Sequence, residues 1–349
     1  MENVVYLLGA GFSAPFGLPV MSNFLEKSKD QYYRDPETYS HFLEVIKTID
    51  EMAKIKNYYN TDLHNIEEIL SILEMQSLLA GGEKRDLFVR YIVDVIDYHT
   101  RKITEVPRGA DELFKALFGN DALWQLCGIF AAALLGYRFS RSGNGPLCRI
   151  RVTVAQNRET QYSVVTLNYD TVLERIIKFM HVQIDTVTCP SFFRKKFEDG
   201  TKDEPNQTPL AKLHGCVEEK NIVPPTWNKV LLKDNNLLST WRTASGLLSQ
   251  ANYIRIIGYS LPVSDSYIKY LLRSAIMDSR HLKRIDVVCL DPGGDVKQRF
   301  DNFICYPKYR FKSDTTENYL SACTSLDGDK YDTYSAQLDP KHDQYMLDG

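Results

Sequence analysis

The chain has 349 residues, enough for two domains or for one large domain with an insertion and a sizeable core. Its hydrophobic fraction of 44% and charged fraction of 25% are ordinary for a globular protein, and a net charge of −3 argues against a basic nucleic-acid-binding surface. The longest apolar run, near 126–137, is too short to span a bilayer, so we expect no membrane insertion.

The seven cysteines are scattered along the chain, odd in number and without a C-x-x-C pair. No segment has the features of a signal peptide. This usage predicts a reduced, cytoplasmic compartment, with neither disulfides nor a structural zinc site. We therefore expect no metal in the protein.

The first predicted element is an apolar, β-branched strand over residues 4–8 that ends in a glycine-rich turn. The residues of that turn are Gly9, Ala10, Gly11, Phe12 and Ser13. Glycine permits a tight turn at positive φ, and the following helix then presents its positive end to a phosphate. The pattern favours nucleotide binding, although such turns also serve only to reverse the chain. A dehydrogenase is disfavoured, because the polar segment 27–34 stands where a second strand ending in an acid should follow.

Residues from about 35 to 140 are predicted to be nearly all helical. Apolar residues repeat at helical spacing over 42–49 and 66–73, and further helical stretches cover 87–103 and 111–137. Asn65 fits an N-cap before Ile66, with two glutamates in the first turn. An alternative is that segment 65–68 covers a nucleotide site, but a plain helix start is favoured.

Strand-like runs return in the second half of the chain, with helical segments over 171–180 and 266–277 between them. The runs are 162–167, 182–188, 210–213, 253–257 and 285–290. This alternation predicts an α/β fold: a Rossmann-like parallel sheet with helices on both faces, plus a large all-helical insertion. We expect the α/β domain over 1–34 and 150–310, the insertion over 35–149, and a polar, peripheral or partly disordered C-terminal segment over 311–349.

Four strands are followed at once by glycine or polar residues. The segments after them are Gly9 to Ser13; Asn168, Tyr169 and Asp170; His214 and Gly215; and Gly258, Tyr259 and Ser260. In an open α/β sheet, ligands bind beyond the carboxyl ends of the strands. If these strands are parallel neighbours, all four segments face one crevice.

These segments resemble the sirtuin superfamily, in the same order along the chain. Gly-Ala-Gly-x-Ser followed by Gly-Leu-Pro is similar to the opening NAD loop, and Leu-Asn-Tyr-Asp at 167–170 to the family's Gln-Asn-Ile-Asp. His214 and Gly215 resemble the catalytic His-Gly, and 258–261 the Gly-Thr-Ser-Leu segment. Asp291 falls where the last strand of the family presents a polar residue to the adenosine ribose.

The departures from the sirtuin deacylases are as informative. Val20, Met21 and Ser22 replace the Asp-Phe-Arg that follows Gly-Ile-Pro, and the four-cysteine zinc ribbon is missing. A helical insertion of about 100 residues takes its place. This pattern resembles bacterial sirtuin-like effectors of anti-phage defence, which implies hydrolysis of NAD to nicotinamide and ADP-ribose. The alternatives are a non-catalytic sensor of NAD or an ADP-ribose derivative and, less favoured, a protein deacylase or ADP-ribosyltransferase.

The resemblance assigns roles that the chemistry supports. Nicotinamide leaves as a neutral ring from a cationic one, so no acid is needed to protonate it, only a polar positioning group and a base. Asn168 is expected to hold the water or a ribose hydroxyl, and His214 to act as the base. Asp170 is expected to bind the nicotinamide carboxamide. The remaining predicted NAD contacts are Gly9, Ala10, Gly11, Phe12, Ser13, Gly258, Tyr259, Ser260 and Asp291.

Each role has a structural alternative. Asn168 and Asp170 could simply cap the helix that begins near 171, His214 could be a buried histidine at a strand end, and 259–265 could be only a turn into the next helix. NAD is expected as the substrate, with no further cofactor. The apolar segment 131–135 must be buried, either against the nucleotide-binding domain or against another subunit. Because the insertion is large, we expect part of it to form a homo-oligomer interface. A partner ATPase or other activator is implied by the resemblance alone.

Overall fold

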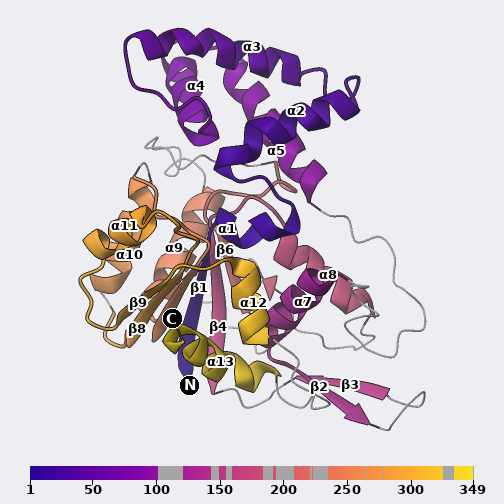
Figure 1. Ribbon diagram of the computed structural model, residues 1–349, viewed down its shortest axis with the longest axis vertical. Coiled ribbons are helices and arrows are strands. Elements are labelled where there is room, and N and C mark those ends of the chain that lie inside the picture. Colours follow the sequence, from indigo (N-terminus) through magenta and orange to yellow (C-terminus); the bar gives the residue numbers. More distant parts are fainter. Residues whose placement is uncertain are drawn as a thin grey trace.

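The computed structural model describes residues 1–100, 121–142, 149–154, 159–183, 192–193, 208–220, 222, 235–263, 265–277, 279–324 and 334–348. Figure 1 shows a sheet covered by helices, with a separate group of helices above the edge at which its strands end. Within the described residues, no helix is both long and apolar enough to cross a membrane.

The sheet has seven strands in the order β5-β6-β4-β1-β7-β8-β9, and every neighbouring pair is parallel. Their bounds are β1 Glu2–Leu8, β4 Thr160–Thr166, β5 Phe192–Phe193, β6 Thr208–Lys212, β7 Tyr253–Ile257, β8 Arg284–Val288 and β9 Tyr309–Lys312. From the central β1 the chain builds β4 and β6 on one side, then β7, β8 and β9 on the other. The strand order therefore reverses between β1 and β7, which is where doubly wound sheets bind ligands.

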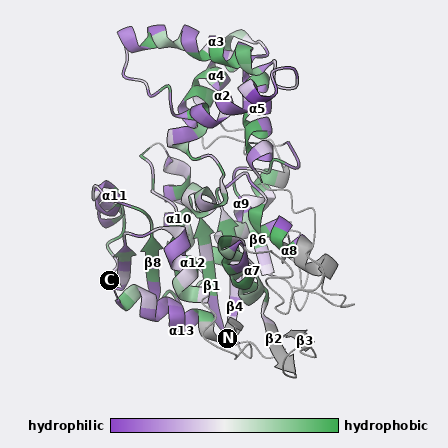
Figure 2. Ribbon diagram, turned by 45° about the vertical axis from the view of Figure 1, so that its right-hand side comes forward, coloured by the Kyte–Doolittle hydropathy of each residue, from purple (hydrophilic) through white to green (hydrophobic). Residues whose placement is uncertain are grey.

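Helices cover both faces of the sheet, as expected for an all-parallel arrangement. Alternate side chains of β1 enter two separate hydrophobic cores, Val4, Tyr6 and Leu8 in one and Val5 and Leu7 in the other. The first core also contains residues of α7 (Ala122–Leu135), α8 (Val172–Gln183), α12 (Thr316–Thr324) and α13 (Tyr334–Leu347); the second contains residues of α9 (Asn235–Ser249), α10 (Ser266–Met277) and α11 (Asp295–Phe303). Figure 2 shows hydrophobic strands between these layers and a mostly hydrophilic α11. The predicted Rossmann-like fold is confirmed.

The segment between β1 and β4 begins with α1 (Ala10–Ser13) and two short 3-10 turns, Ala14–Phe16 and Met21–Asn23. It continues through α2 (Phe24–Arg34), α3 (Phe42–Met52), a 3-10 turn Ala53–Asn57, α4 (Ile66–Ala80) and α5 (Lys84–His99). The predicted helices over 42–49 and 66–73 lie inside α3 and α4, and α5 contains most of 87–103. The predictions for 101–120 lie outside the described residues.

The end of this segment differs from the predicted all-helical insertion. Strand β2 (Tyr137–Ser142) pairs antiparallel with β3 (Arg149–Val154), so a hairpin crosses the predicted boundary at 149–150. Helix α7 packs against β4, α8, α12 and α13 and belongs to the layer on the sheet. The apolar segment 131–135 is therefore buried within one chain; Leu134 is 0% exposed. Of the two predicted ways of burying this segment, the structure shows packing against the sheet domain.

Two other expectations need correction. The predicted strand 182–188 is contradicted at its start, because α8 continues to Gln183, and the rest lies outside the described residues. The C-terminal segment is not peripheral where the structure describes it. Strand β9 extends the sheet, and Tyr319 and His342, on α12 and α13, are both 0% exposed. Charged and polar side chains, described below, make important contacts of this C-terminal segment. Sequence patterns detect apolar contacts and therefore missed them.

Candidate active site

The four predicted segments do lie at one edge of the sheet. Leu8 pairs in register with Thr166 on one side and with Ile257 on the other, and Thr166 pairs with Lys212. All four strands are parallel, so the chain leaves each of them at the same edge. The segments that begin at Gly9, Leu167, Leu213 and Gly258 are therefore neighbours although they are far apart in sequence.

The turns after β1 and β7 interlock at the point where the strand order reverses. The Gly11 amide donates to the Gly258 carbonyl at 2.8 Å, and a Cβ on Gly258 would lie 2.2 Å from the Phe12 nitrogen. Gly258 also has a φ of 67°, so it needs glycine for both space and conformation. A Cβ on Gly9 would lie 2.6 Å from the Gly258 carbonyl oxygen. The glycines therefore allow two backbones to approach closely.

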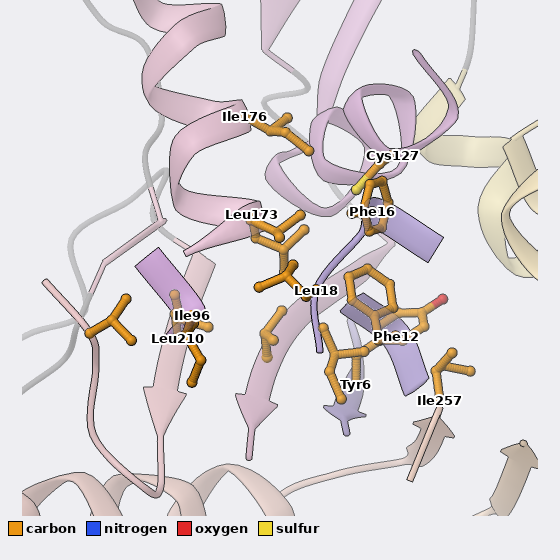
Figure 3. Packing of buried hydrophobic residues seen from close by; sticks show 14 of the residues in the cluster. Tyr6, Phe12, Phe16, Leu18, Ile96, Cys127, Leu173, Ile176, Leu210 and Ile257 are labelled. Carbon is orange, nitrogen blue, oxygen red and sulfur yellow. The ribbon is translucent and has the colours of Figure 1, made fainter. Parts of the chain in front are cut away.

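In the first turn, three backbone amides that could bind a phosphate are already engaged. The amides of Gly9, Gly11 and Phe12 already donate to backbone carbonyls, and α1 has only four residues. Ala10 is the exposed residue at the tip, whereas the Phe12 side chain is 1% exposed and lies in the core near Tyr6 (Figure 3). Only the backbone of Phe12 belongs to the candidate site.

Asn168 connects the second segment to the first. Its Nδ2 atom donates to the Gly9 carbonyl at 2.9 Å and to Ser13 Oγ at 3.0 Å, and its backbone amide donates to Thr166 Oγ1 at 3.1 Å. The side chain is 8% exposed. Asn168 is thus held at the ends of β1 and β4. It does not cap the following helix, which was the structural alternative for this residue.

Asp170 does cap that helix, because its Oδ1 accepts the Val172 amide at 3.1 Å. Burial raises the pKa of Asp170, while Lys212, the Ser13 hydroxyl and the Val172 amide oppose that rise. The Lys212 ammonium binds the Asp170 carbonyl and, at 2.9 Å, Glu174 Oε1. A buried lysine thus joins β6 to the start of α8 beneath the candidate site.

His214 is 4% exposed, and burial lowers the pKa of its imidazole, with Asp265 opposing. The ring is therefore neutral near pH 7, the form a base requires. It lies between Tyr169 and Trp241, at ring-centroid distances of 6.1 Å and 6.4 Å, and Trp241 donates to the Leu213 carbonyl at 3.0 Å. Among the described residues, the ring nitrogens have no hydrogen-bond partner.

The fourth segment is bent and tightly held. Leu261 has a φ of 50°, an uncommon conformation for a branched residue and more so before a proline. The Tyr259 hydroxyl donates to Asp265 Oδ2 at 2.7 Å, and Asp265 Oδ1 accepts the Ile268 amide at the start of α10. Arg299 donates to the Ser260 carbonyl at 3.0 Å. The segment is a turn into a helix, and it also fixes Asp265 near His214.

Asp291 follows β8 and is 9% exposed, but its carboxylate caps α11. Oδ1 accepts the Val296 amide at 3.1 Å and Oδ2 the Lys297 amide at 2.8 Å. Burial favours the protonated acid, yet these amides hold the pKa of Asp291 below its usual value. The Asp291 amide itself donates to Ser313 Oγ at 3.0 Å.

Sequence reasoning missed several supporting residues. Thr316 donates to the Gly11 carbonyl at 2.9 Å, and Lys212, Trp241 and Arg299 hold the other three segments. Thr316 carries no signal in the sequence because it comes from a segment that reads as polar. Asp265 could have been found, since an aspartate directly before an amphipathic helix is a cap signal.

One cluster in the described part of the chain could coordinate a cation, formed by Asp286, His342 and Asp343. Arg310 donates from Nε and Nη2 to the Asp286 carboxylate at 2.6 Å and 2.9 Å, and from Nη2 to Asp343 Oδ1 at 3.0 Å. Arginines therefore already neutralise these carboxylates, and the cluster is an ion-pair network. It involves β8, β9 and α13, apart from the strand ends that carry the candidate site.

The strand order, with glycine turns interlocked where it reverses, defines a doubly wound fold of the nucleotide-binding type. A family model described as a SIR2-like domain matches residues 162–304, which include Asn168, His214 and the turn at Gly258. This part of the chain is therefore similar to the SIR2-like domain family. A comparison with curated proteins gives no match.

Solved structures of sirtuins are similar over nearly the whole chain. A structure of Sir2Tm bound to a propionylated peptide is 15% identical, with 91% of this chain and 90% of that chain covered and a TM-score of 0.34. A Sir2 structure with a p53 peptide and NAD+ is 14% identical, with the same coverage and a TM-score of 0.35.

Proposed function

We propose that the protein is an NAD glycohydrolase that releases nicotinamide and ADP-ribose. The observation that carries the proposal is the placement of Asn168 and the neutral His214 on neighbouring segments beside the interlocked turns. A binding module would need the turns but has no use for a base. NAD is then the substrate, and the reaction uses no further cofactor.

In the proposed reaction, the bond between the ribose C1′ and the nicotinamide nitrogen breaks, and its electron pair stays on the ring nitrogen. The ring thereby becomes neutral without protonation. A water oxygen forms the new bond to C1′, and His214 takes the proton that this water loses. Asn168 holds the water or a ribose hydroxyl through its amide. In this proposal Ala10, Ser13 and Ser260 contact phosphate or ribose, and Asp170 binds the carboxamide.

The test is to incubate the purified protein with NAD and to measure nicotinamide and ADP-ribose by chromatography. Asn168→Ala and His214→Ala should each lower the rate at least ~100-fold, the scale expected for loss of a positioning group or a general base. Asn302→Ala and His281→Ala, at exposed positions, serve as matched controls. Parent-like cleavage by either site variant would refute its assigned role.

The same experiment separates the alternatives. A sensor would bind NAD without releasing nicotinamide, and a deacylase or transferase would release it only with an acyl-lysine or protein acceptor. Because nicotinamide is already a good leaving group and no cysteine set has zinc-site spacing, EDTA should leave the rate unchanged. Cleavage that required added zinc would revive the deacylase alternative.

We extend the proposal to a role as an NAD-depleting effector of anti-phage defence that works as a homo-oligomer with a partner ATPase or other activator. The support for this role is the sequence resemblance. The insertion offers apolar surface for such contacts: Leu78 and Leu79, at the end of α4, are 66% and 77% exposed. A groove of about 550 Å³ between α3 and α4 is lined in part by Met52, Ile72 and Leu79.

A further inference from the structure

Aromatic side chains flank His214. The Tyr169 ring lies 6.1 Å from the His214 ring and the Trp241 ring 6.4 Å from it, measured between ring centroids. Distances of this size are within the range of direct packing between rings. Tyr169 packs against the hydrophobic core on one face of the sheet and Trp241 against the core on the other face. The imidazole therefore lies between two aromatic rings that belong to different layers.

The Trp241 ring is held in place from two directions. Its indole N–H donates to the carbonyl of Leu213, the residue directly before His214, at 3.0 Å. The ring of Tyr267, on α10, packs edge-on against the indole at a centroid distance of 6.4 Å and an interplanar angle of 80°. The indole is thus tied to the segment that carries His214 and supported by a second helix.

This arrangement limits what can reach the proposed base. His214 is 4% exposed, and its ring nitrogens form no hydrogen bond with the described residues. A general base must come within about 2.6–3.2 Å of the atom whose proton it takes. A nucleophile that gives its proton to His214 therefore has to enter beside the flanking rings, and these rings limit its size.

Resting on the proposed function, we propose that Trp241 is a specificity-determining residue that restricts the nucleophile to water. Once the bond between C1′ and the nicotinamide nitrogen breaks, the oxygen of a nucleophile ROH forms the new bond to C1′, and its proton passes to His214. Water gives ADP-ribose, whereas an alcohol gives the O-alkyl ADP-ribose by the same balance. The Trp241 ring excludes the larger R groups, and Tyr267 keeps it in place.

The test adds methanol or ethanol, at equal concentrations, to the reaction of the purified protein with NAD. Mass spectrometry then measures each O-alkyl ADP-ribose relative to the ADP-ribose formed in the same reaction. The parent should favour methanol over ethanol by about tenfold, the scale at which a close-fitting pocket rejects one methylene, and Trp241→Ala should lower this preference to less than about threefold. Because each product is compared with ADP-ribose from the same reaction, a general loss of activity or of folded protein cancels.

Three further variants complete the experiment. Trp241→Phe retains a ring and should keep most of the preference for methanol. Tyr267→Ala leaves Trp241 present but removes its support, so the preference should fall in the same direction as in Trp241→Ala, and this variant carries the test if Trp241→Ala does not fold. Tyr270→Ala is the matched control, because Tyr270 is a 61% exposed ring on the same helix as Tyr267.

The outcomes separate this inference from the proposed function. A parent that used both alcohols equally, a preference unchanged in Trp241→Ala and Tyr267→Ala, or no alkyl product from any variant would overturn the role of Trp241 and leave NAD hydrolysis standing. A parent that released no nicotinamide would refute the proposed function and this inference with it.

Discussion

At the scale of single residues, the candidate site depends on polar side chains that hold backbone atoms of distant segments. Asn168, Thr316 and Arg299 each bind a carbonyl in one of the turns, at 2.9 Å, 2.9 Å and 3.0 Å. Hydrogen bonds of this kind add little net stability, but leaving a buried partner unsatisfied is costly. Substitutions here should therefore disturb the turns as well as the chemistry, and controls must report folding.

Gly258→Ala should be far more destabilising than Gly17→Ala. Both glycines have positive φ, 67° and 87°, but a Cβ on Gly258 would meet the backbone of residues 11–12, whereas Gly17 has open space. Left-handed strain alone costs about 1–2 kcal/mol, and the overlap at Gly258 adds roughly 1–3 kcal/mol. Urea unfolding of both variants measures the difference, and equal losses would show that the two turns do not interlock.

At the scale of elements, the sequence predicted the strands and helices whose packing is apolar. The runs 253–257 and 266–277 coincide with β7 and α10, because both are bounded by turn residues and have clear periodicity. The four strand-end segments were also predicted as neighbours. Helix α8 was predicted too short, since Val182 reads equally well as the start of a strand.

The elements that were missed are those fixed by contacts between distant polar residues. Arg310 and Lys312 make β9 look like surface, yet Arg310 binds Asp286 on β8 and Lys312 donates to the Tyr345 carbonyl on α13 at 2.7 Å. No local sequence pattern indicates that such distant residues pair. The sequence also left open what covers the segment 131–135, because the helices that pack on α7 include two from the end of the chain.

Leu134→Ala on α7 should lower the stability of the single chain. Leu134 is 0% exposed, and truncating a buried leucine costs about 2–5 kcal/mol. Leu79→Ala, at a site 77% exposed, should change stability by less than about 0.5 kcal/mol. Thermal denaturation and light scattering on both proteins distinguish burial within one chain from burial at an interface between copies. Dissociation of an oligomer by Leu134→Ala, without loss of stability, would return this residue to an interface.

At the scale of the whole molecule, a buried polar network attaches the C-terminal helix to the sheet. His342 lies between Asp286 and Tyr319, at 3.0 Å from each, and Arg255 binds the Tyr6 hydroxyl at 2.8 Å and Asp339 at 2.7 Å. All these side chains except Asp339 are at most 1% exposed. Removing one partner of such a network leaves an uncompensated buried charge, which typically costs about 3–5 kcal/mol.

The stability of the fold should therefore fall in mild acid. Burial lowers the pKa of His342 to about 4, so the unfolded chain, with histidine near 6.5, binds the extra proton between those values. Stability is then complete above pH ~6.5 and declines by on the order of 3 kcal/mol as the pH falls towards 4. The pKa of Asp286 is also held low, mainly by His342 and Arg310 against burial, which adds a loss below pH ~4.

Urea unfolding at a series of pH values measures this dependence. His342→Gln keeps a donor for Asp286 but cannot titrate, so its stability should fall less than that of the parent between pH 6.5 and 4.5, where His214 still titrates. His281→Gln, at an exposed histidine, should retain the parent profile. A parent protein whose stability did not change over that range would show that His342 is not buried in its neutral form.

The central position of β1 has a consequence for the synthesis of the protein. Leu8 accepts a hydrogen bond from Thr166, 158 residues later, and its other neighbour, β7, comes later still. At ~5–20 residues per second, the ribosome needs about 10–30 s to deliver the first of these partners. Helices α2–α5 make local contacts and can fold in that interval. Strand β1, the most apolar strand of the sheet, remains unpaired during this time. Nascent chains stalled before residue 160 should therefore present β1 to chaperones although their helical insertion has already formed.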